Sequence, residues 1–273
     1  MVKALVITGF GINCEEEMSA AFELAGAKAT IVHLNEILQE DVSIHDFDIL
    51  SFPGGFSFGD DLASGKVMAN KIKYKRLPSG GVLIDEIKLF LSNGHFIIGV
   101  CNGFQMLVRM GLLPNLGLQF EPQATLSNNN SAKFEDRWVK CLVNPKSKSP
   151  FLKGVSHIDL PARHGEGKLI FIDEEVKEQI EQGALNCMSY CSPDGTPTDE
   201  YPYNPNGAEL NCAGLISTDG QVFGLMPHPE AFLSKYNHPN WANMKRNSDS
   251  FNEEGDGLVF FKNIVEHIQT KTT

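Results

Sequence analysis

The stretch Gly99-Val100-Cys101-Asn102-Gly103 decides how the rest of the sequence is interpreted. It overlaps the end of the uncharged run Phe96–Val100, which predicts a strand buried on both faces. It opens the segment Cys101–Met110, whose pattern predicts a helix that ends at Gly111. A strand that turns sharply into a helix through small residues is the nucleophile-elbow pattern, here with cysteine in place of serine.

The physics of this turn is specific. Glycines on both sides of Cys101 permit the tight turn that a strained central residue requires. The amino terminus of the following helix supplies partial positive charge and free N–H groups, which favour a thiolate and can stabilise a developing oxyanion. The alternative is a small buried cysteine in an α/β turn, without any chemistry. The elbow alone leaves both interpretations open.

A base and an orienting carboxylate for this nucleophile stand in Met226-Pro227-His228-Pro229-Glu230, after the predicted strand Val222–Met226. In an extended chain His228 and Glu230 are two residues apart and point the same way. The carboxylate then holds the imidazole in one tautomer and leaves its other nitrogen for the sulfur. The alternative is a proline-rich turn with a surface histidine, which the pairing with the elbow disfavours.

A glycine-rich stretch, Pro53-Gly54-Gly55-Phe56-Ser57-Phe58-Gly59-Asp60, follows the predicted strand Phe47–Phe52. Ligands of open α/β sheets bind at the carboxyl ends of the strands. The backbone N–H groups of Gly55 and Asn102 are therefore candidates for an oxyanion hole. An ordinary glycine-rich turn is the alternative. No glycine pattern typical of phosphate loops or dinucleotide folds opens a helix there.

The alternation of strand and helix patterns predicts an open, mostly parallel α/β sheet with flanking helices, in a single domain over residues 1–273. A first helix is expected to start at Asn13, with Glu16 in its first turn, and to stop at Gly26. The other predicted strands are Val2–Ile7, Ala29–Leu34, Phe134–Val143 and Leu169–Asp173. The other predicted helices are Val82–Leu91, Glu174–Gln182 and a C-terminal helix carrying Leu258, Phe261, Val265 and Ile268. Pro193–Pro205 predicts a long loop and Ser234–Gly257 a polar, turn-rich segment.

Composition excludes several classes of function. The 273 residues carry 23 basic and 34 acidic side chains, a net charge of −11, which argues against nucleic acid or an anionic membrane as the main partner. No stretch approaches the ~18 apolar residues of a membrane span, and the N-terminus does not have the pattern of a signal peptide. Six cysteines are too sparse for a disulfide scaffold and indicate a reducing cytoplasm.

Neither the histidine nor the cysteine spacings favour metal binding. His164-Gly-Glu-Gly167 has no further ligand pattern, and Cys187, Cys191 and Cys212 do not have zinc-site spacing, so no metal is expected in this chain. Cys14 is expected in a polar cap region at the start of the first helix rather than in catalysis.

Together these motifs resemble the class I, triad-type glutamine amidotransferases. More narrowly, they resemble the branch formed by glutaminase subunits of phosphoribosylformylglycinamidine synthase, an enzyme of purine biosynthesis. The narrower resemblance rests on the order and identity of four further stretches: Gly11-Ile-Asn-Cys-Glu15, Phe134-Glu-Asp-Arg-Trp138, His164-Gly-Glu-Gly167 and Asn204-Pro-Asn-Gly207. It runs from about residue 3 to the C-terminal helix.

The resemblance implies a flavodoxin-like fold and a catalytic triad. Cys101 would attack the side-chain amide of L-glutamine, His228 would pass the proton to the leaving ammonia, and Glu230 would orient His228. The oxyanion and the substrate would be bound by Gly54, Gly55, Asn102 and Gln105. For Gln105 the alternative is an ordinary residue on a helix surface.

The resemblance also implies partners. Ammonia would pass to a separate ATP-dependent synthetase subunit, and a small third subunit often bridges the two. ATP and Mg²⁺ would bind that synthetase, so this chain would hold no cofactor. Three departures concern partner contacts more than chemistry: Ala231 stands where the family usually has arginine, Lys71–Gly81 resembles an insertion, and Pro193–Pro205 is long.

Two other classes of function stay open at this point. One is a different cysteine hydrolase with the same elbow architecture, which the branch-specific motifs disfavour. The other is a non-catalytic subunit that keeps the fold. Loss of a triad residue would be its usual sign, and Cys101, His228 and Glu230 are all present.

Overall fold

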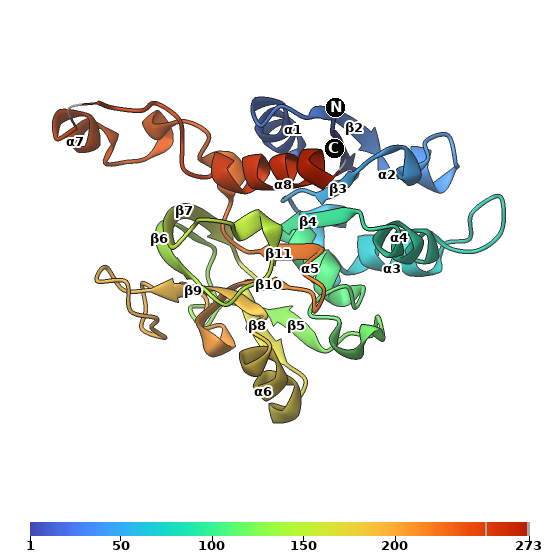
Figure 1. Ribbon diagram of the computed structural model, residues 1–273. Helices are drawn as coiled ribbons and strands as arrows, with labels where there is room; N and C mark the ends of the chain where they lie inside the picture. The colour runs from blue at the N-terminus through green and yellow to red at the C-terminus, as the bar shows by residue number, and fades with distance from the viewer. Residues whose placement is uncertain (249, 272–273) are drawn as a thin grey trace.

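The computed structural model describes residues 1–248 and 250–271. Position 249 of the predicted turn-rich segment and residues 272–273 of the predicted domain lie outside the described residues. The described strands form a nine-stranded sheet in the order β2-β1-β3-β4-β11-β10-β9-β6-β7 and a small sheet of β5 and β8 (Figure 1). Their bounds are β1 Lys3–Thr8, β2 Lys28–His33, β3 Ile49–Phe52, β4 Phe96–Val100, β5 Ala124–Ser127, β6 Glu135–Val143, β7 His157–His164, β8 Lys168–Phe171, β9 Asn186–Cys191, β10 Cys212–Ile216 and β11 Val222–Leu225.

Strand directions confirm the predicted class. The neighbours β2, β1, β3, β4 and β11 all pair in parallel. The strands β10, β9, β6 and β7 then follow in antiparallel pairs. Because the pairs alternate, β9 and β7 run in the direction of the parallel strands, and among the described strands of this sheet β10 and β6 oppose them. The sheet is therefore mostly parallel, with an extension of alternating strands on one side.

Helices cover both faces of the parallel part (Figure 1). α1 and α8 pack against each other on one face, where the rings of Phe22 and Phe261 meet edge to face at 5.0 Å. α3, α4 and α5 lie on the other face. The bounds of the described helices are α1 Glu15–Leu24, α2 Leu34–Leu38, α3 Lys66–Tyr74, α4 Leu83–Ser92, α5 Asn102–Arg109, α6 Glu174–Gln182, α7 Trp241–Arg246 and α8 Leu258–Lys271. Within residues 1–248 and 250–271, no helix is long and apolar enough to cross a membrane.

Several predicted bounds need correction. The first helix begins at Glu15, after Cys14, so Asn13 does not cap it. Leu34 is not in a strand, because the His33 side chain accepts the Asn35 N–H and starts α2 there. The strands β5, β7, β9 and β10 and the helices α2, α3 and α7 were not predicted. Lys71, the first residue of the suspected insertion, lies inside α3.

The topology brings four chain segments to one edge of the sheet. β1, β3, β4 and β11 are consecutive neighbours and parallel, so their carboxyl ends lie side by side. The segments that follow them carry Cys14, Gly54, Cys101 and His228 respectively. These are the segments on which the sequence placed its chemistry, with the addition of Cys14.

Candidate active site

Cys101 occupies a strained turn between β4 and α5. Its backbone has φ 52° and ψ −107°, a conformation that a non-glycine residue adopts only when its surroundings enforce it. A Cβ added to Gly103 would lie 1.8 Å from the carbonyl oxygen of Phe52, and one added to Gly99 would lie 2.5 Å from Leu107 Cδ1. Both glycines are therefore required by close backbone packing, as the elbow pattern predicts.

His228 and Glu230 form a buried pair beside Cys101. His228 Nδ1 lies 2.6 Å from Glu230 Oε1, and the two residues are 3% and 2% exposed. The His228 backbone N–H donates to Pro161 O of β7 at 2.8 Å. Burial alone would lower the pKa of His228, but the charge of Glu230 and the thiol of Cys101 outweigh it and hold that pKa well above its usual value. The pair has the geometry of a base held by an orienting carboxylate.

The other nitrogen of this imidazole faces the reacting side. His228 Nε2 is buried and has no hydrogen-bond partner among residues 1–248 and 250–271. The Cys101 sulfur lies 3.6 Å from Arg163 O, at the end of β7, and the Cys101 N–H donates to Leu225 O at 2.8 Å. The last residues of β7 thus flank the site from the antiparallel part of the sheet.

The two glycines predicted to bind substrate have different surroundings. A Cβ added to Gly54 would lie 2.8 Å from His228 Cε1 and 3.5 Å from Cys101 Cβ, so Gly54 borders the site directly. Gly55 has φ +145°, and a Cβ there would lie 2.6 Å from the carbonyl oxygen of Gly11. Gly55 is therefore pressed against the loop that follows β1. The oxyanion role of its N–H stays a prediction.

Asn102 and Gln105 belong to one buried hydrogen-bond network. Asn102 Oδ1 accepts the Ser57 N–H at 3.2 Å, and its Nδ2 donates to Gln105 Oε1 at 2.9 Å. Gln105 Nε2 donates to Glu166 O at 2.6 Å. Gln105 is 3% exposed, so the surface alternative is wrong for it. The network ties the glycine-rich loop, α5 and the His-Gly-Glu-Gly stretch together.

Charged groups to which the sequence analysis gave no role in substrate binding adjoin this network. Arg109 Nε donates to Ser64 O at 2.7 Å, and the Ser64 N–H donates to Glu166 Oε2 at 3.1 Å. Ser64 Oγ donates to Asp60 Oδ2 at 2.9 Å. Burial raises the pKa of Asp60 and lowers that of Arg109. Opposite charges close to Gln105 suit a free amino acid, which carries both an ammonium and a carboxylate.

His164 is a buried neutral imidazole. It is 2% exposed, and its Nδ1 lies 3.2 Å from Asn129 Oδ1, which also accepts the Gly167 N–H at 3.0 Å. Because that oxygen can only accept, His164 carries its proton on Nδ1. Burial lowers the pKa of His164 to about 4. These contacts stabilise the turn that carries Glu166.

The expectation for Cys14 needs correction. It precedes α1 but makes no side-chain cap. Its sulfur instead lies 3.2 Å from the position of a Cβ on Gly54, and ligand atoms of Cys14, His228 and Glu230 all lie within 4.8 Å of one another. The strand order explains this position of Cys14, because Cys14 follows β1, and β1 lies next to β3, the strand that Gly54 follows. Cys187, Cys191 and Cys212 are free, buried thiols.

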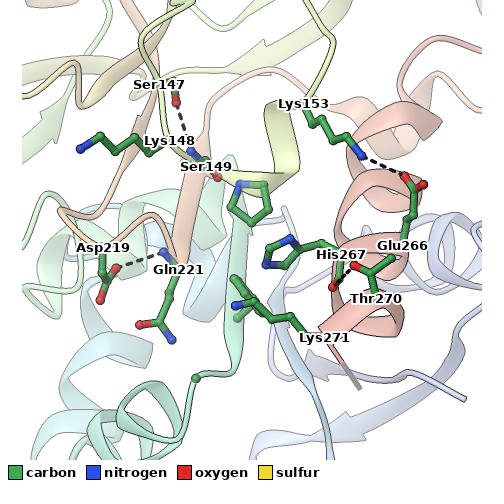
Figure 2. A pocket seen from close by; sticks show the side chains of 13 residues that line it. Ser147, Lys148, Ser149, Lys153, Asp219, Gln221, Glu266, His267, Thr270 and Lys271 are labelled. Atoms are coloured by element: carbon green, nitrogen blue, oxygen red, sulfur yellow. Dashed lines mark hydrogen bonds and ion pairs between the residues drawn. The ribbon is translucent and has the colours of Figure 1, made fainter. Parts of the chain in front are cut away.

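A cavity of about 640 Å³ lies at the opposite edge of the sheet (Figure 2). Its walls include Phe96 at the start of β4, Gln221 just before β11, and His267 of α8. Cys101 follows the other end of β4, so this cavity is separate from the site. Lys153 and Glu266 pair across its rim at 3.6 Å.

Comparison with known proteins gives consistent results. Residues 1–268 match the CobB/CobQ-like glutamine amidotransferase domain. The phosphoribosylformylglycinamidine synthase subunit PurQ of Dehalococcoides mccartyi is 41% identical over 266 residues, and that of Methanococcus maripaludis strain S2 is 39% identical over 272, each match covering 97% of both chains. A chain of the PurLQS structure from Thermotoga maritima matches with a TM-score of 0.71 and 28% identity, over 98% of this chain and 99% of that one. The chain therefore belongs to the CobB/CobQ-like glutamine amidotransferase family.

Proposed function

We propose that this chain is the glutaminase subunit of a phosphoribosylformylglycinamidine synthase. It hydrolyses L-glutamine to glutamate and passes the ammonia to an ATP-dependent synthetase subunit in purine biosynthesis. The proposal is supported by the family, by relatives that are named as this subunit over nearly their whole length, and by a neighbour whose structure is described as PurLQS. The observation that carries it is the strained Cys101 beside the buried His228–Glu230 pair.

The chemistry follows from these positions. The Cys101 sulfur attacks the side-chain amide carbon of glutamine, and an imidazolium at His228 gives its proton to the departing ammonia. A water molecule, deprotonated by His228, then attacks the thioester and releases glutamate. Glu230 holds the imidazole and stabilises its charged form. The first N–H groups of α5, beginning with Asn102, are suited to the oxyanion because they point out of the helix terminus.

Selection of glutamine is assigned to the network around Gln105. The ammonium and carboxylate of the substrate would meet the charged groups of Asp60, Glu166 and Arg109. ATP and Mg²⁺ would bind the synthetase, and this chain would hold no cofactor. The full assembly would include the synthetase and a small bridging subunit. The six free thiols of this chain support a place in the reducing cytoplasm.

Cys101→Ala tests the proposal. With the synthetase present, glutamine-dependent synthesis is expected to fall at least about 10⁴-fold, the scale seen when a nucleophile is removed. Synthesis from free ammonia is expected to persist, because the synthetase site is separate. Substantial glutamine-dependent turnover by the variant would exclude Cys101 as the nucleophile. Loss of both activities would point to a non-catalytic role in assembly.

A further inference from the structure

The glycine-rich loop beside the site, with the residues just after it, has a backbone that most side chains disfavour. Phe58 and Asp60 both have φ 55°, and Ala63 has φ 108°, values that non-glycine residues adopt only at a cost in free energy. Gly59, between the first two, has φ 71°. The loop therefore keeps this conformation only while contacts with neighbouring elements hold it.

One group of such contacts lies around Phe58. The Phe58 N–H donates to the carbonyl oxygen of Phe10 at 2.7 Å, and the two rings lie 5.2 Å apart. The Lys71 ammonium of α3 lies over both rings, 4.8 Å from the centre of Phe58 and 5.5 Å from that of Phe10. Both distances allow a cation–π interaction. Within residues 1–248 and 250–271 no carboxylate pairs with Lys71, so the two rings are the partners of its charge.

We infer that Lys71 is a positioning residue of the glutaminase, whose ammonium holds Phe58 against Phe10 and thereby keeps the glycine-rich loop in its reactive conformation. The inference rests on the proposed function, because the loop is given its task by glutamine hydrolysis. Lys71 acts only through the loop. It is also the first residue of the segment in which the sequence suggested an insertion.

The loop reaches the site through Asn102, the first residue of α5. The Ser57 N–H donates to Asn102 Oδ1 at 3.2 Å, and Asn102 Nδ2 donates to Asp60 Oδ1 at 3.3 Å. Ser57 and Asp60 lie on either side of Phe58 in the chain, so a displaced Phe58 disturbs both bonds. Asn102 follows Cys101, and its N–H begins the helix terminus that is suited to the oxyanion. The position of Phe58 is thus linked to the donors that the reaction needs.

The charge of Lys71 is the property to test. Donors that stabilise an oxyanion act on the transition state more than on bound glutamine, so the loss is expected to be larger in kcat than in KM. Lys71→Met keeps an unbranched apolar side chain but removes the charge. Its kcat should fall about 5- to 30-fold, the equivalent of a partly desolvated cation–π contact. Lys71→Arg keeps a cation that stacks on rings and should retain at least about a third of wild-type kcat.

Loop order is measured first, without reference to catalysis. Hydrogen–deuterium exchange of the peptide that spans residues 54–62 is followed in the assembled synthase. The matched control is Lys73→Met, since Lys73 lies on the same helix with its Nζ 5.8 Å from the ring centre of Tyr74, an exposed residue outside the loop. Exchange should be about 5- to 30-fold faster in Lys71→Met, and near the wild-type rate in Lys71→Arg and Lys73→Met.

Glutamate release by the same assemblies is measured next. Lys71→Met with exchange and kcat within about twofold of wild type would overturn the inference, as would an equal loss in Lys73→Met. A loss that Lys71→Arg does not restore would also overturn it, because the shape of the side chain rather than its charge would then be responsible. Wild type that releases no glutamate would instead refute the proposed function, and the exchange rates would still show whether Lys71 orders the loop.

Discussion

The charge of Glu230 is predicted to supply most of the catalytic power of His228. Glu230→Gln keeps the size of the side chain and an oxygen to accept from His228 Nδ1, now 2.6 Å from Glu230 Oε1, but removes the negative charge. Two unit charges about 4 Å apart interact by about 4 kcal/mol at an effective dielectric constant of 20. At 1.36 kcal/mol per tenfold change, loss of that interaction slows the reaction by about 10³-fold.

The loss is expected in kcat rather than in KM, because the imidazolium forms during the reaction and not on binding. Since the charge of Glu230 helps to hold the pKa of His228 above its usual value, the variant should also show that pKa lowered. The assay is glutamate release by the assembled synthase across a range of pH. His228→Ala should be slower still, and the double variant no slower than His228→Ala.

Two controls make the result decisive. Glu254→Gln removes a surface carboxylate that pairs with Lys262, and it is expected to leave turnover unchanged. Ammonia-dependent synthesis should be equal in all variants. A Glu230→Gln enzyme that keeps more than about a tenth of wild-type kcat would refute the reasoning, since a charge interaction of that size could not then act on the transition state.

Three further outcomes are expected. Gly103→Ala places a Cβ 1.8 Å from Phe52 O, so it should destabilise the fold by more than about 3 kcal/mol in urea unfolding. Gly165→Ala, with open space around it, should not destabilise the fold in this way, and equal stabilities of the two variants would contradict the packing of the elbow. The pKa of His164 is about 4 in the folded state and 6.5 in the unfolded state, so the unfolded state binds more protons between these pH values. The free energy of unfolding should therefore fall by about 2 kcal/mol from pH 8 to pH 5, and His164→Asn should lack this part of the pH dependence. The isolated chain should release glutamate more slowly than the assembled synthase, because the glycine-rich loop exposes Phe56 (46%) for a partner to cover; equal rates would exclude such activation.

Local signals were enough to predict the bounds of an element where the residues at its ends determine where it starts or stops. The strand Phe96–Val100 and the helix Glu174–Gln182 have the predicted bounds, the first because an uncharged run ends at the elbow, the second because Asp173 caps it through Val176 N–H. The strand β7 was missed because His157–His164 mixes proline and charged residues, and only its pairing with β6 makes it a strand. Such long-range pairing leaves little trace in the local pattern.

The site residues fall into the same two groups: those that a short motif predicts and those that only long-range packing brings into the site. Cys101, His228 and Glu230 were predicted from short motifs, and the structure brings them together. Cys14 was assigned to a cap, because its place beside His228 depends on β1 lying next to β3. The different surroundings of Gly54 and Gly55 also depend on the loop that follows β1, which no spacing within the glycine-rich stretch reveals.

The arrangement of strands has a consequence for the newly made protein. The proposed nucleophile, Cys101, follows β4, its proposed base follows β11, and the carbonyl groups beside them, from Pro161 and Arg163, are on β7. During synthesis Cys101 therefore leaves the ribosome more than a hundred residues before His228. Until the last strands insert, the thiol has no base and the elbow no flanking strand. An incomplete chain cannot waste glutamine, because the reactive centre is among the last features of the fold to assemble.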